Sequence, residues 1–395
     1  MRVRHLDRVA SLPAEQWNAL FPAAYPFTRH AFLSALEEHG CVSPELGWSP
    51  CHVVLTDELG VVAAAPLYVK GHSYGEFVFD FAWADASRRI GQPYYPKLIN
   101  AIPFTPCSGP RLGARDEAAR RLIAGRLPDI ARAAGLSGCH ALFVDDADFA
   151  AYQSAGLVER NDVQFHWFNQ GPNGPYRDFT DFVSTFTSDK RKKILRERRR
   201  VAEAGIRFEI RAGHELSEAE WTRVYALYAS TYAERSQTPY LTPEFFLDYG
   251  RQADTPVRLV LAYEDSAMVA VAITLRGGDT LYGRHWGAAD RYHSLHFETC
   301  YYQGIDYCIR EGLRHFDAGA QGEHKLARGF TPQITRSAHW LSEPRLFDAV
   351  SDHLERERAY VEQREALLDE HTPYKRPDNR LGDPTGAAKM DNRDG

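Results

Sequence analysis

"VVLTDELGVVAAAPLYVK", residues Val53–Lys70, aligns without a gap on "LVLAYEDSAMVAVAITLR", residues Leu259–Arg276. Each stretch has an apolar and β-branched run, a short acidic turn, and a second run of small and branched residues. This order is the pattern of a β-hairpin. Because the same hairpin pattern occurs twice, we expect the chain to contain two copies of one fold.

The segments after the two hairpins also correspond in order. "EFVFDFAWAD", ending at Asp85, and "TLYGRHWGAAD", ending at Asp290, each predict a further strand. "YYPKLINAI" from Tyr94 and "YYQGIDYCI" from Tyr301 follow, with apolar residues at helical spacing, and another short strand comes after each. The predicted fold class is therefore α/β, with two tandem domains that are each a mixed, mainly antiparallel sheet flanked by helices.

Three helices are expected ahead of the second hairpin, with Ser188, Ser217 and Thr242 as their N-caps. A last helix is expected from Glu343 to His371, and the polar segment after it is expected to be a disordered tail. The predicted units are a first half, residues 1–160, a second half, residues 161–371, and a tail, residues 372–395.

Length and composition narrow the class of protein. The 395 residues suit two domains, and 44% hydrophobic with 25% charged residues is typical of a globular protein. No apolar run approaches the roughly 18 residues of a membrane span, so we expect no integral membrane association. The N-terminus lacks an apolar signal segment, which predicts a cytoplasmic protein. The net charge of -6 disfavours a protein that coats DNA.

Neither the cysteines nor the histidines form a metal-binding pattern. The six cysteines include no C-x-x-C pair, which disfavours a zinc knuckle and a disulfide framework. Cys107 has no histidine placed beside it by a motif, and we interpret it as a structural thiol. His293, His296 and Glu298 lie close together, but their spacing is not H-E-x-x-H. We expect no metal and no tightly bound cofactor.

"DAGAQGEHKLARGF", residues Asp317–Phe330, gathers ionisable groups on a glycine-rich frame. Asp317 ends a predicted strand, a position where an α/β sheet presents side chains to a ligand. If a helical turn follows, His324 and Arg328 share one face. Two interpretations stay open: a turn in which Glu323 pairs with Lys325 or Arg328, and the mouth of a site for acyl transfer.

The predicted strand "LYGRHWGAAD" is a second candidate. Strict alternation places Tyr282, Arg284 and Trp286 on one face and His285, between two glycines, on the other. Either face could line a pocket or be half-buried structure.

The helix "DKRKKILRERRR" carries eight cations between Lys190 and Arg200. Such a run is either a solvated face or a surface for CoA phosphates, a nucleotide-linked precursor, anionic lipid or tRNA.

Four stretches carry a resemblance to a known family: "PFTPCSGPRL" from Pro103, the basic helix, "HFETCYYQGIDYC" from His296, and "FDAGAQGEHKLARGFTP" from Phe316. Together they resemble the GNAT acyltransferase superfamily in tandem, and specifically the Fem-type peptidyltransferases and their FemAB-like relatives. The resemblance covers roughly residues 25–360. It implies two GNAT-like domains and an N-acyltransferase whose second half is catalytic.

The resemblance also implies roles for individual residues. Lys325 would stabilise phosphate or oxyanion charge, Arg328 would bind a phosphate or carboxylate, and His324 or Glu323 would be the general base. The implied catalytic residues are Lys325, His324, Glu323, Asp317 and His285. The implied binding residues are Arg328, Arg284, Tyr282, Lys190, Arg191, Lys193 and Arg111, with Tyr94 and Tyr95 as possible lining of a crevice in the first half.

Three functions remain open at this point. The acyl donor could be acyl-CoA, because no long helical arm of the kind that Fem enzymes carry lies between Gly205 and Leu259, and because "RHWGAA" from Arg284 fits a pyrophosphate loop. The donor could instead be an aminoacyl-tRNA. In both cases the acceptor would be a small-molecule or peptide amine, such as a peptidoglycan precursor. The third possibility is a non-catalytic module that binds a cell-wall precursor or anionic lipid.

Overall fold

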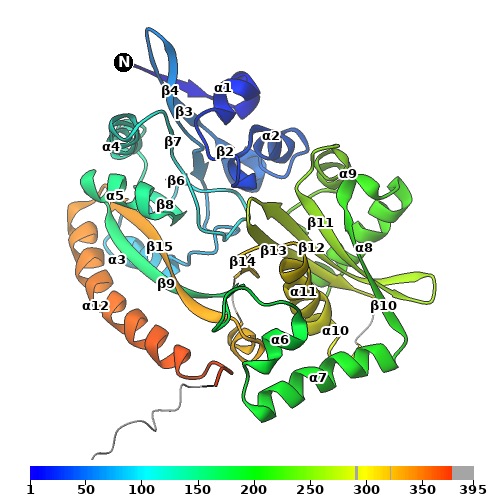
Figure 1. Cartoon of the computed structure of the whole chain (residues 1–395). Helices are drawn as coiled ribbons and strands as arrows, with labels where there is room; N and C mark the ends of the chain where they lie inside the picture. Colours follow the sequence, from blue (N-terminus) through cyan, green and yellow to red (C-terminus); the bar gives the residue numbers. More distant parts are fainter. Residues whose placement is uncertain (290–291, 321, 376–395) are drawn as a thin grey trace, which may run out of the picture.

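The computed structural model describes residues 1–289, 292–320 and 322–375 (Figure 1). Within this part of the chain, the strands form a four-stranded sheet and an 11-stranded sheet. The first has the order β1 (Arg2–Leu6), β3 (His52–Asp57), β4 (Gly60–Ala65), β7 (Gly113–Ala114). The second has the order β10 (Ile206–Ala212), β11 (Val257–Glu264), β12 (Ala267–Gly277), β13 (Thr280–Ala288), β14 (His315–Asp317), β9 (Val158–Phe168), β15 (Thr331–Leu341), β8 (Gly138–Val144), β6 (Lys97–Asn100), β5 (Tyr68–Lys70), β2 (Trp48–Pro50).

The helices surround these sheets. The α-helices are α1 (Ala14–Asn18), α2 (His30–Glu38), α3 (Phe81–Arg89), α4 (Glu117–Ala133), α5 (Asp146–Ser154), α6 (Phe179–Ser184), α7 (Ser188–Glu203), α8 (Glu218–Ala233), α9 (Pro243–Arg251), α10 (Leu295–Phe297), α11 (Gln303–Arg310) and α12 (Pro344–Asp369). Short 3₁₀ turns are η1 (Val9–Ser11), η2 (Pro26–Thr28), η3 (Pro44–Leu46), η4 (Gly213–Glu215) and η6 (Glu323–Arg328), and η5 (Glu298–Tyr302) is a π-helical turn.

Both predicted hairpins form. β3 and β4 pair antiparallel with Val54 opposite Ala64, and β11 and β12 pair antiparallel with Leu261 opposite Val271. The predicted helix starts at Ser217 and Thr242 are also present, because each side chain accepts a hydrogen bond from the third backbone N–H of its helix. Helix α7 begins one residue earlier than expected, with Thr187 rather than Ser188 at the N-cap.

Two predicted elements are wrong. The segment from Tyr94 contains strand β6 instead of a helix, and all four residues of β6 are buried. A short apolar run of this kind fits either element, and burial in the sheet interior decides for the strand. The segment ending at Asp85 contains helix α3 instead of a strand, with Trp83 and Ser87 on its buried side.

Strand β15 joins the two halves into one sheet. It pairs antiparallel with β9 on one side, from Thr331 opposite His166 to His339 opposite Val158. On its other side it pairs antiparallel with β8, from Arg336 opposite Val144 to Leu341 opposite Gly138. A strand of the second half thus lies between β8 of the first half and β9, which crosses the predicted boundary at residue 160, and α12 runs along this part of the sheet (Figure 1).

The start of the predicted tail is ordered. Lys375 N donates to Thr185 O, Thr187 N donates to Pro373 O, and the Tyr374 hydroxyl donates to Gly329 O. Residues 372–375 therefore pack against α6 and the segment after η6. The remainder of the predicted tail, residues 376–395, lies outside the described residues.

Helices pack on both faces of the β10–β13 part of the sheet. Leu227 and Tyr228 of α8 share a core with Leu261 of β11, whereas Val201 of α7 and Leu295 of α10 share another core with strand residues. Helix α8 lies so close to β13 that a Cβ on Gly287 would fall 1.9 Å from Leu227 O. Among the described helices, none has both the length and the apolar composition needed to cross a membrane.

The contact between α8 and β13 can be tested with two glycine substitutions. Gly287→Ala should lower the free energy of unfolding by about 3 kcal/mol, because the added methyl group forces α8 away from the sheet. Gly125→Ala is the matched control, since Gly125 is inside α4 and no atom lies within 4 Å of its Cβ position. It should raise stability by about 0.5–1 kcal/mol. Denaturant unfolding measures both, and equal effects would contradict the packing.

Candidate functional site

The two strands at the centre of the second half diverge. β13 and β14 run parallel, but they pair only over Thr280–Tyr282 and His315–Asp317, while β13 continues to Ala288. Gly319, with φ of +80°, comes directly after β14, and a Cβ there would lie 3.0 Å from Gly283 O. The chain therefore crosses close to β13 at this point, and the polar edge of β13 beyond it is left unpaired by β14.

Asp317 lies at the junction of the two halves. Its Oδ1 accepts a hydrogen bond from Gly319 N at 2.9 Å, and His166 Nε2 of β9 lies 3.7 Å away. Burial raises the pKa of Asp317, but His166, the Gly319 N–H and Lys325 outweigh it, so the pKa is lower than usual. Burial and the Asp317 carboxylate raise the pKa of the Cys107 thiol, consistent with the structural role predicted for this residue.

Lys325 is buried beside Asp317, with 1% of its surface exposed. Its Nζ donates to Gly319 O at 2.6 Å, so the side chain closes the turn between β14 and η6. Burial lowers the pKa of Lys325 to about 8, while Asp317 acts in the opposite direction. A lysine with this pKa carries a proton at neutral pH and releases it readily above pH 8.

His324 faces an aromatic pocket formed by the helix after β13. Its Nε2 lies 2.9 Å from the Tyr301 hydroxyl, and the rings of His296 and Phe297 are neighbours. Tyr301 belongs to the π-helical turn η5, a distortion that is frequent at functional sites. Burial, Arg328 and Lys325 all lower the pKa of His324, so its imidazole is neutral at pH 7.

Arg328 and Glu323 point away from this pocket. Arg328 Nη2 donates to both oxygens of Glu197 on α7 at 3.1 Å, its Nη1 donates to His324 O at 2.7 Å, and its guanidinium lies over the Phe297 ring. Glu323 pairs with Arg364 of α12 at 2.9 Å. The carboxylate bound by Arg328 is therefore one of the chain's own, and Glu323 pairs with neither Lys325 nor Arg328.

A β-bulge changes the predicted alternation of β13. Ile273 is opposite His285 and Thr274 is opposite Gly283, so Arg284 is the extra residue. Tyr282 and His285 consequently face the same core, where they contact Phe27 and Tyr228, respectively. Burial is the main reason why the pKa of His285 lies well below its usual value. The positive charge of the nearby Arg284 lowers this pKa further.

Arg284 and Arg111 bind backbone atoms of one loop of the first half. Arg284 Nη2 donates to Phe104 O, and its Nη1 lies 3.6 Å from Cys107 Sγ. The fully buried Arg111 donates to Cys107 O, Leu142 O and other carbonyls of residues 109–110, and to the Tyr25 hydroxyl. "RHWGAA" is therefore largely part of a strand, with Gly287 packed on α8, rather than a pyrophosphate loop.

A cavity of about 480 Å³ opens beside the end of β13. It is lined by Thr231, Glu234, Trp286, Ala288, Ala289, Tyr292, Leu295 and His296. The Trp286 and His296 rings meet with centroids 5.1 Å apart, and His296 is 6.1 Å from the ring of His324. His296 thus both lines the cavity and neighbours His324, and we call this cavity the β13 cavity.

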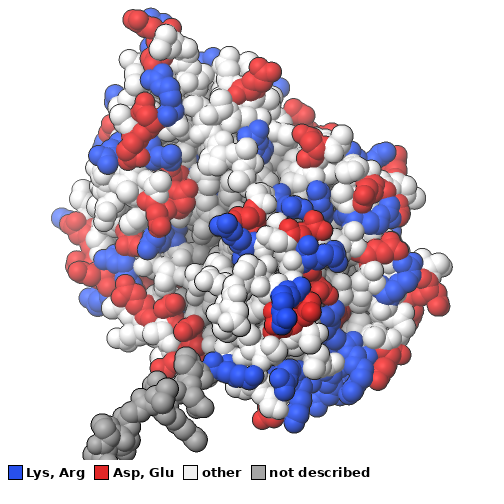
Figure 2. Space-filling view, viewed as in Figure 1, with Lys and Arg blue, Asp and Glu red and all other residues white. Residues whose placement is uncertain are grey.

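The basic helix α7 approaches the rim of the β13 cavity. Arg200 Nη1 donates to His293 Nε2 at 2.6 Å. In the sequence, His293 lies between Tyr292 and Leu295, which both line the cavity. Lys190 and Lys193 are exposed and Arg191 is half-buried. Figure 2 shows that Lys and Arg gather over this helix at the lower edge of the molecule, whereas charges of both signs alternate elsewhere on this face.

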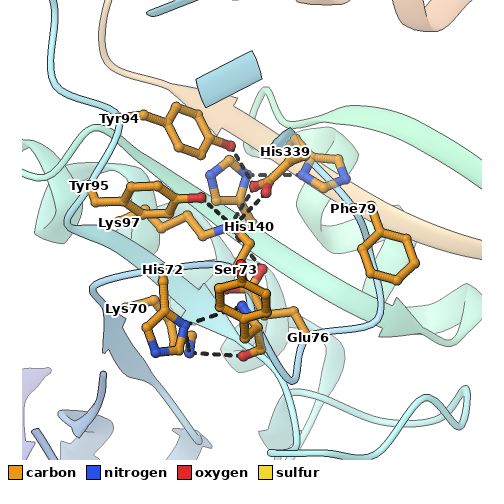
Figure 3. A network of polar contacts seen from close by, with 12 residues as sticks. Lys70, His72, Ser73, Glu76, Phe79, Tyr94, Tyr95, Lys97, His140 and His339 are labelled. Atoms are coloured by element: carbon orange, nitrogen blue, oxygen red, sulfur yellow. Dashed lines mark hydrogen bonds and ion pairs between the residues drawn. The ribbon is translucent and has the colours of Figure 1, made fainter. Parts of the chain in front are cut away.

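The first half contains a second buried polar cluster, shown in Figure 3. Lys97 Nζ donates to Ser73 Oγ and Glu76 Oε2 at 2.8 Å and to Asp80 Oδ2 at 2.5 Å. Asp80 also accepts from the Tyr94 hydroxyl at 2.6 Å. The side chains predicted to line a crevice, Tyr94 and Tyr95, therefore point into this cluster.

Burial shifts the proton affinities within this Lys97 cluster. Burial raises the pKa of Glu76 to about 7, although the positive charge of Lys97 acts in the opposite direction. Burial also lowers the pKa of Lys70 to about 7. Lys97 and hydrogen bonds overcome burial at Asp80 and lower its pKa to about 2. Because Lys97, Lys70, Glu76 and Asp80 are all buried, the Lys97 cluster fixes residues 70–80 to strand β6.

Removing the central cation should destabilise this half. Lys97→Met leaves Asp80 buried and uncompensated, and we expect a loss of about 3–5 kcal/mol in the free energy of unfolding. Asp80→Asn combined with Lys97→Met should recover part of this loss, because the Asp80 carboxylate is then no longer stranded and Glu76, with its pKa raised to about 7, can take up a proton. Denaturant unfolding of both variants distinguishes a charge effect from simple loss of packing, which the second substitution would not repair.

Several site residues escape sequence reasoning. His166 lies in β9 within no motif, and Glu197 appears as one of two acids in a basic helix. In the sequence, His296 stands out only for its closeness to His293 and Glu298, which suggests a metal ligand rather than a neighbour of His324. Spacing along the chain gives no signal for any of these contacts, since their partners lie on other elements.

The profile of the FemAB-like family, described as peptidoglycan biosynthesis/recognition, matches residues 8–376. A comparison with curated protein sequences finds no match.

Several solved structures share the fold. The C-terminal domain (DUF2156) of a protein described as a lysylphosphatidylglycerol synthetase from Agrobacterium fabrum is 10% identical, with a TM-score of 0.53, over 86% of this chain and 95% of that one. FemX is 9% identical, with a TM-score of 0.50, over 89% and 100%. A tandem GNAT protein from the clavulanic acid biosynthesis pathway is 13% identical, with a TM-score of 0.41, over 87% and 98%.

The family profile confirms the predicted resemblance to the FemAB-like family, and the mixed sheets flanked by helices confirm the predicted α/β class. With the family profile covering nearly the whole described chain, the protein belongs to the FemAB-like family.

Proposed function

We propose that the protein transfers an acyl or aminoacyl group to an amine acceptor, and that the reaction takes place where β13 and β14 diverge. The observation that carries this proposal is the alignment of three features at one place: the unpaired edge of β13, the β13 cavity, and the neutral imidazole of His324. An acyl donor on an extended arm could pair with a free strand edge through backbone hydrogen bonds. The acceptor amine would then enter through the cavity.

Residues around His324 supply the chemistry that this reaction needs. A neutral imidazole can take the proton that the amine loses as it attacks the acyl carbon. We assign this role to His324, with Tyr301 orienting the ring through its hydroxyl. We assign Lys325 the role of holding the turn at Gly319 and placing a positive charge beside the reacting carbonyl. Asp317 holds the same turn through Gly319 N.

The donor class is the finer part of the proposal. Both FemX and a tandem GNAT protein share the architecture, and the cationic face of α7 near the cavity suits any phosphate-bearing donor. The position of "RHWGAA" within a strand removes one argument for acyl-CoA. We therefore propose an activated acyl ester, aminoacyl-tRNA or acyl-CoA, with a peptide or peptidoglycan-precursor amine as acceptor in the cytoplasm.

Binding at the β13 cavity can be tested before any activity is known. Thermal unfolding should shift upward with the correct donor among acetyl-CoA, longer acyl-CoAs and bulk aminoacyl-tRNA, since a ligand at about 100 times its Kd adds about 2.7 kcal/mol. Ala289→Trp fills the cavity mouth and should abolish the shift. Ala267→Trp, at another exposed alanine on the same sheet, should leave it intact. A shift that survives in Ala289→Trp would place the donor elsewhere.

The roles of His324 and Lys325 predict the pH dependence of the transfer rate. His324 must be neutral, and because its pKa is lowered, kcat/KM should rise with pH only below about 6.5. Lys325 must be protonated, so kcat/KM should fall above about pH 8. His324→Gln should lower kcat about 100-fold and remove the acidic limb. His353→Gln, on the exposed side of α12, is the control and should change neither; an unchanged profile in His324→Gln would exclude it as the base.

A further inference from the structure

The outward face of α7 is a continuous cationic surface. Ile194, Glu197 and Val201 form the buried side of the helix. At 3.6 residues per turn, the opposite side carries the exposed residues Lys192, Lys193, Leu195, Arg196, Arg199 and Arg200. The helix forms an outer edge of the molecule (Figure 1), and the same edge is where cations gather in Figure 2.

The positive charge on this face is largely uncompensated. Lys192, Lys193 and Arg196 form no hydrogen bond or ion pair with any residue in the described ranges, and Arg199 has only a 3.6 Å contact with Glu203. Lys192 with Arg196, and Arg196 with Arg200, are like-charge pairs four residues apart, which destabilise a helix. The chain as a whole has a net charge of -6, so this concentration of cations is local. A bound polyanion would relieve the repulsion.

An exposed apolar side chain distinguishes between kinds of polyanion. Leu195 is 48% exposed and lies among the cations. The face belongs to a single helix on a convex edge, and it carries no aromatic side chain on which a base could stack. Proteins that hold single-stranded nucleic acid combine a groove with such aromatic platforms. A convex helix that presents cations around an aliphatic side chain suits the surface of an anionic bilayer instead.

We propose that residues 192–200 of α7 dock the protein on the surface of an anionic lipid bilayer. The cations bind lipid phosphates and Leu195 enters the acyl boundary. This inference is independent of the transfer reaction. Docking through α7 also places the β13 cavity near the bilayer, because Arg200 binds His293 at the rim of that cavity.

The test uses the full chain and vesicles of defined composition. The protein should co-sediment with vesicles of phosphatidylcholine and phosphatidylglycerol at about 3:1, and not with pure phosphatidylcholine. Lys192→Gln, Lys193→Gln and Arg196→Gln together should weaken binding about 100-fold, from the contribution of each cation near an anionic surface. The control is Arg89→Gln, Arg126→Gln and Arg345→Gln, which removes the same charge from α3, α4 and α12 and should leave binding unchanged.

A single substitution separates lipid from RNA. Leu195→Ser should weaken vesicle binding about fivefold while leaving any binding to bulk tRNA unchanged, because only the bilayer buries the leucine. Equal loss in the two triple variants would show that net charge alone is responsible and would overturn the proposal. So would binding to tRNA without binding to anionic vesicles. None of these outcomes depends on acyl transfer, which the donor-binding experiment tests separately.

Discussion

The insertion of β15 between β8 and β9 is the constraint on which the arrangement of the molecule depends. A strand near the end of the chain fills the gap between β8 of the first half and β9, which crosses the predicted boundary at residue 160, so the two halves share one continuous sheet. This shared sheet fixes β9 beside β14, and it thereby brings His166 of the first strand to Asp317 of the second.

The loop that carries Cys107 shows how the first half supports the second. Arg111 donates hydrogen bonds to the backbone carbonyls of Cys107, Gly109 and Pro110 in this loop. Arg284 reaches across from the bulge in β13 to Phe104 of the same loop. The Arg111 guanidinium binds the loop from within the first half, and the Arg284 guanidinium binds it from the second half. Arg111 and Arg284, which the sequence analysis gives as candidate binding residues, therefore bind backbone atoms where the two halves meet.

Sequence reasoning succeeded where a pattern is local. Alternating apolar runs around a turn gave both hairpins, and side-chain caps gave the starts of α8 and α9, because each signal depends on residues a few positions apart. It failed for β6, whose apolar run is compatible with two elements until its neighbours in the sheet are known. The motif from Asp317 to Phe330 predicts a site at the end of β14, and that placement stays a prediction.

The sequence does not predict which side chains Glu323 and Arg328 of that motif bind. One of the two interpretations pairs Glu323 with Lys325 or Arg328 inside its own turn, but Glu323 binds Arg364 of α12, and Arg328 binds Glu197 of α7. Such contacts join positions more than 40 and 130 residues apart. They follow from the packing of helices around the sheet, which no spacing rule encodes.

The ion pair between Glu197 and Arg328 has a mechanical consequence. Glu197 is buried and also accepts from the Tyr302 hydroxyl, so a slide or rotation of α7 would strand a carboxylate in the interior. Helix α7, the turn η5 and the segment η6 therefore behave as one stiff block. A displacement of α7 at the outer edge of the molecule is therefore coupled, through Glu197, to the backbone around His324, because Arg328 also donates to His324 O.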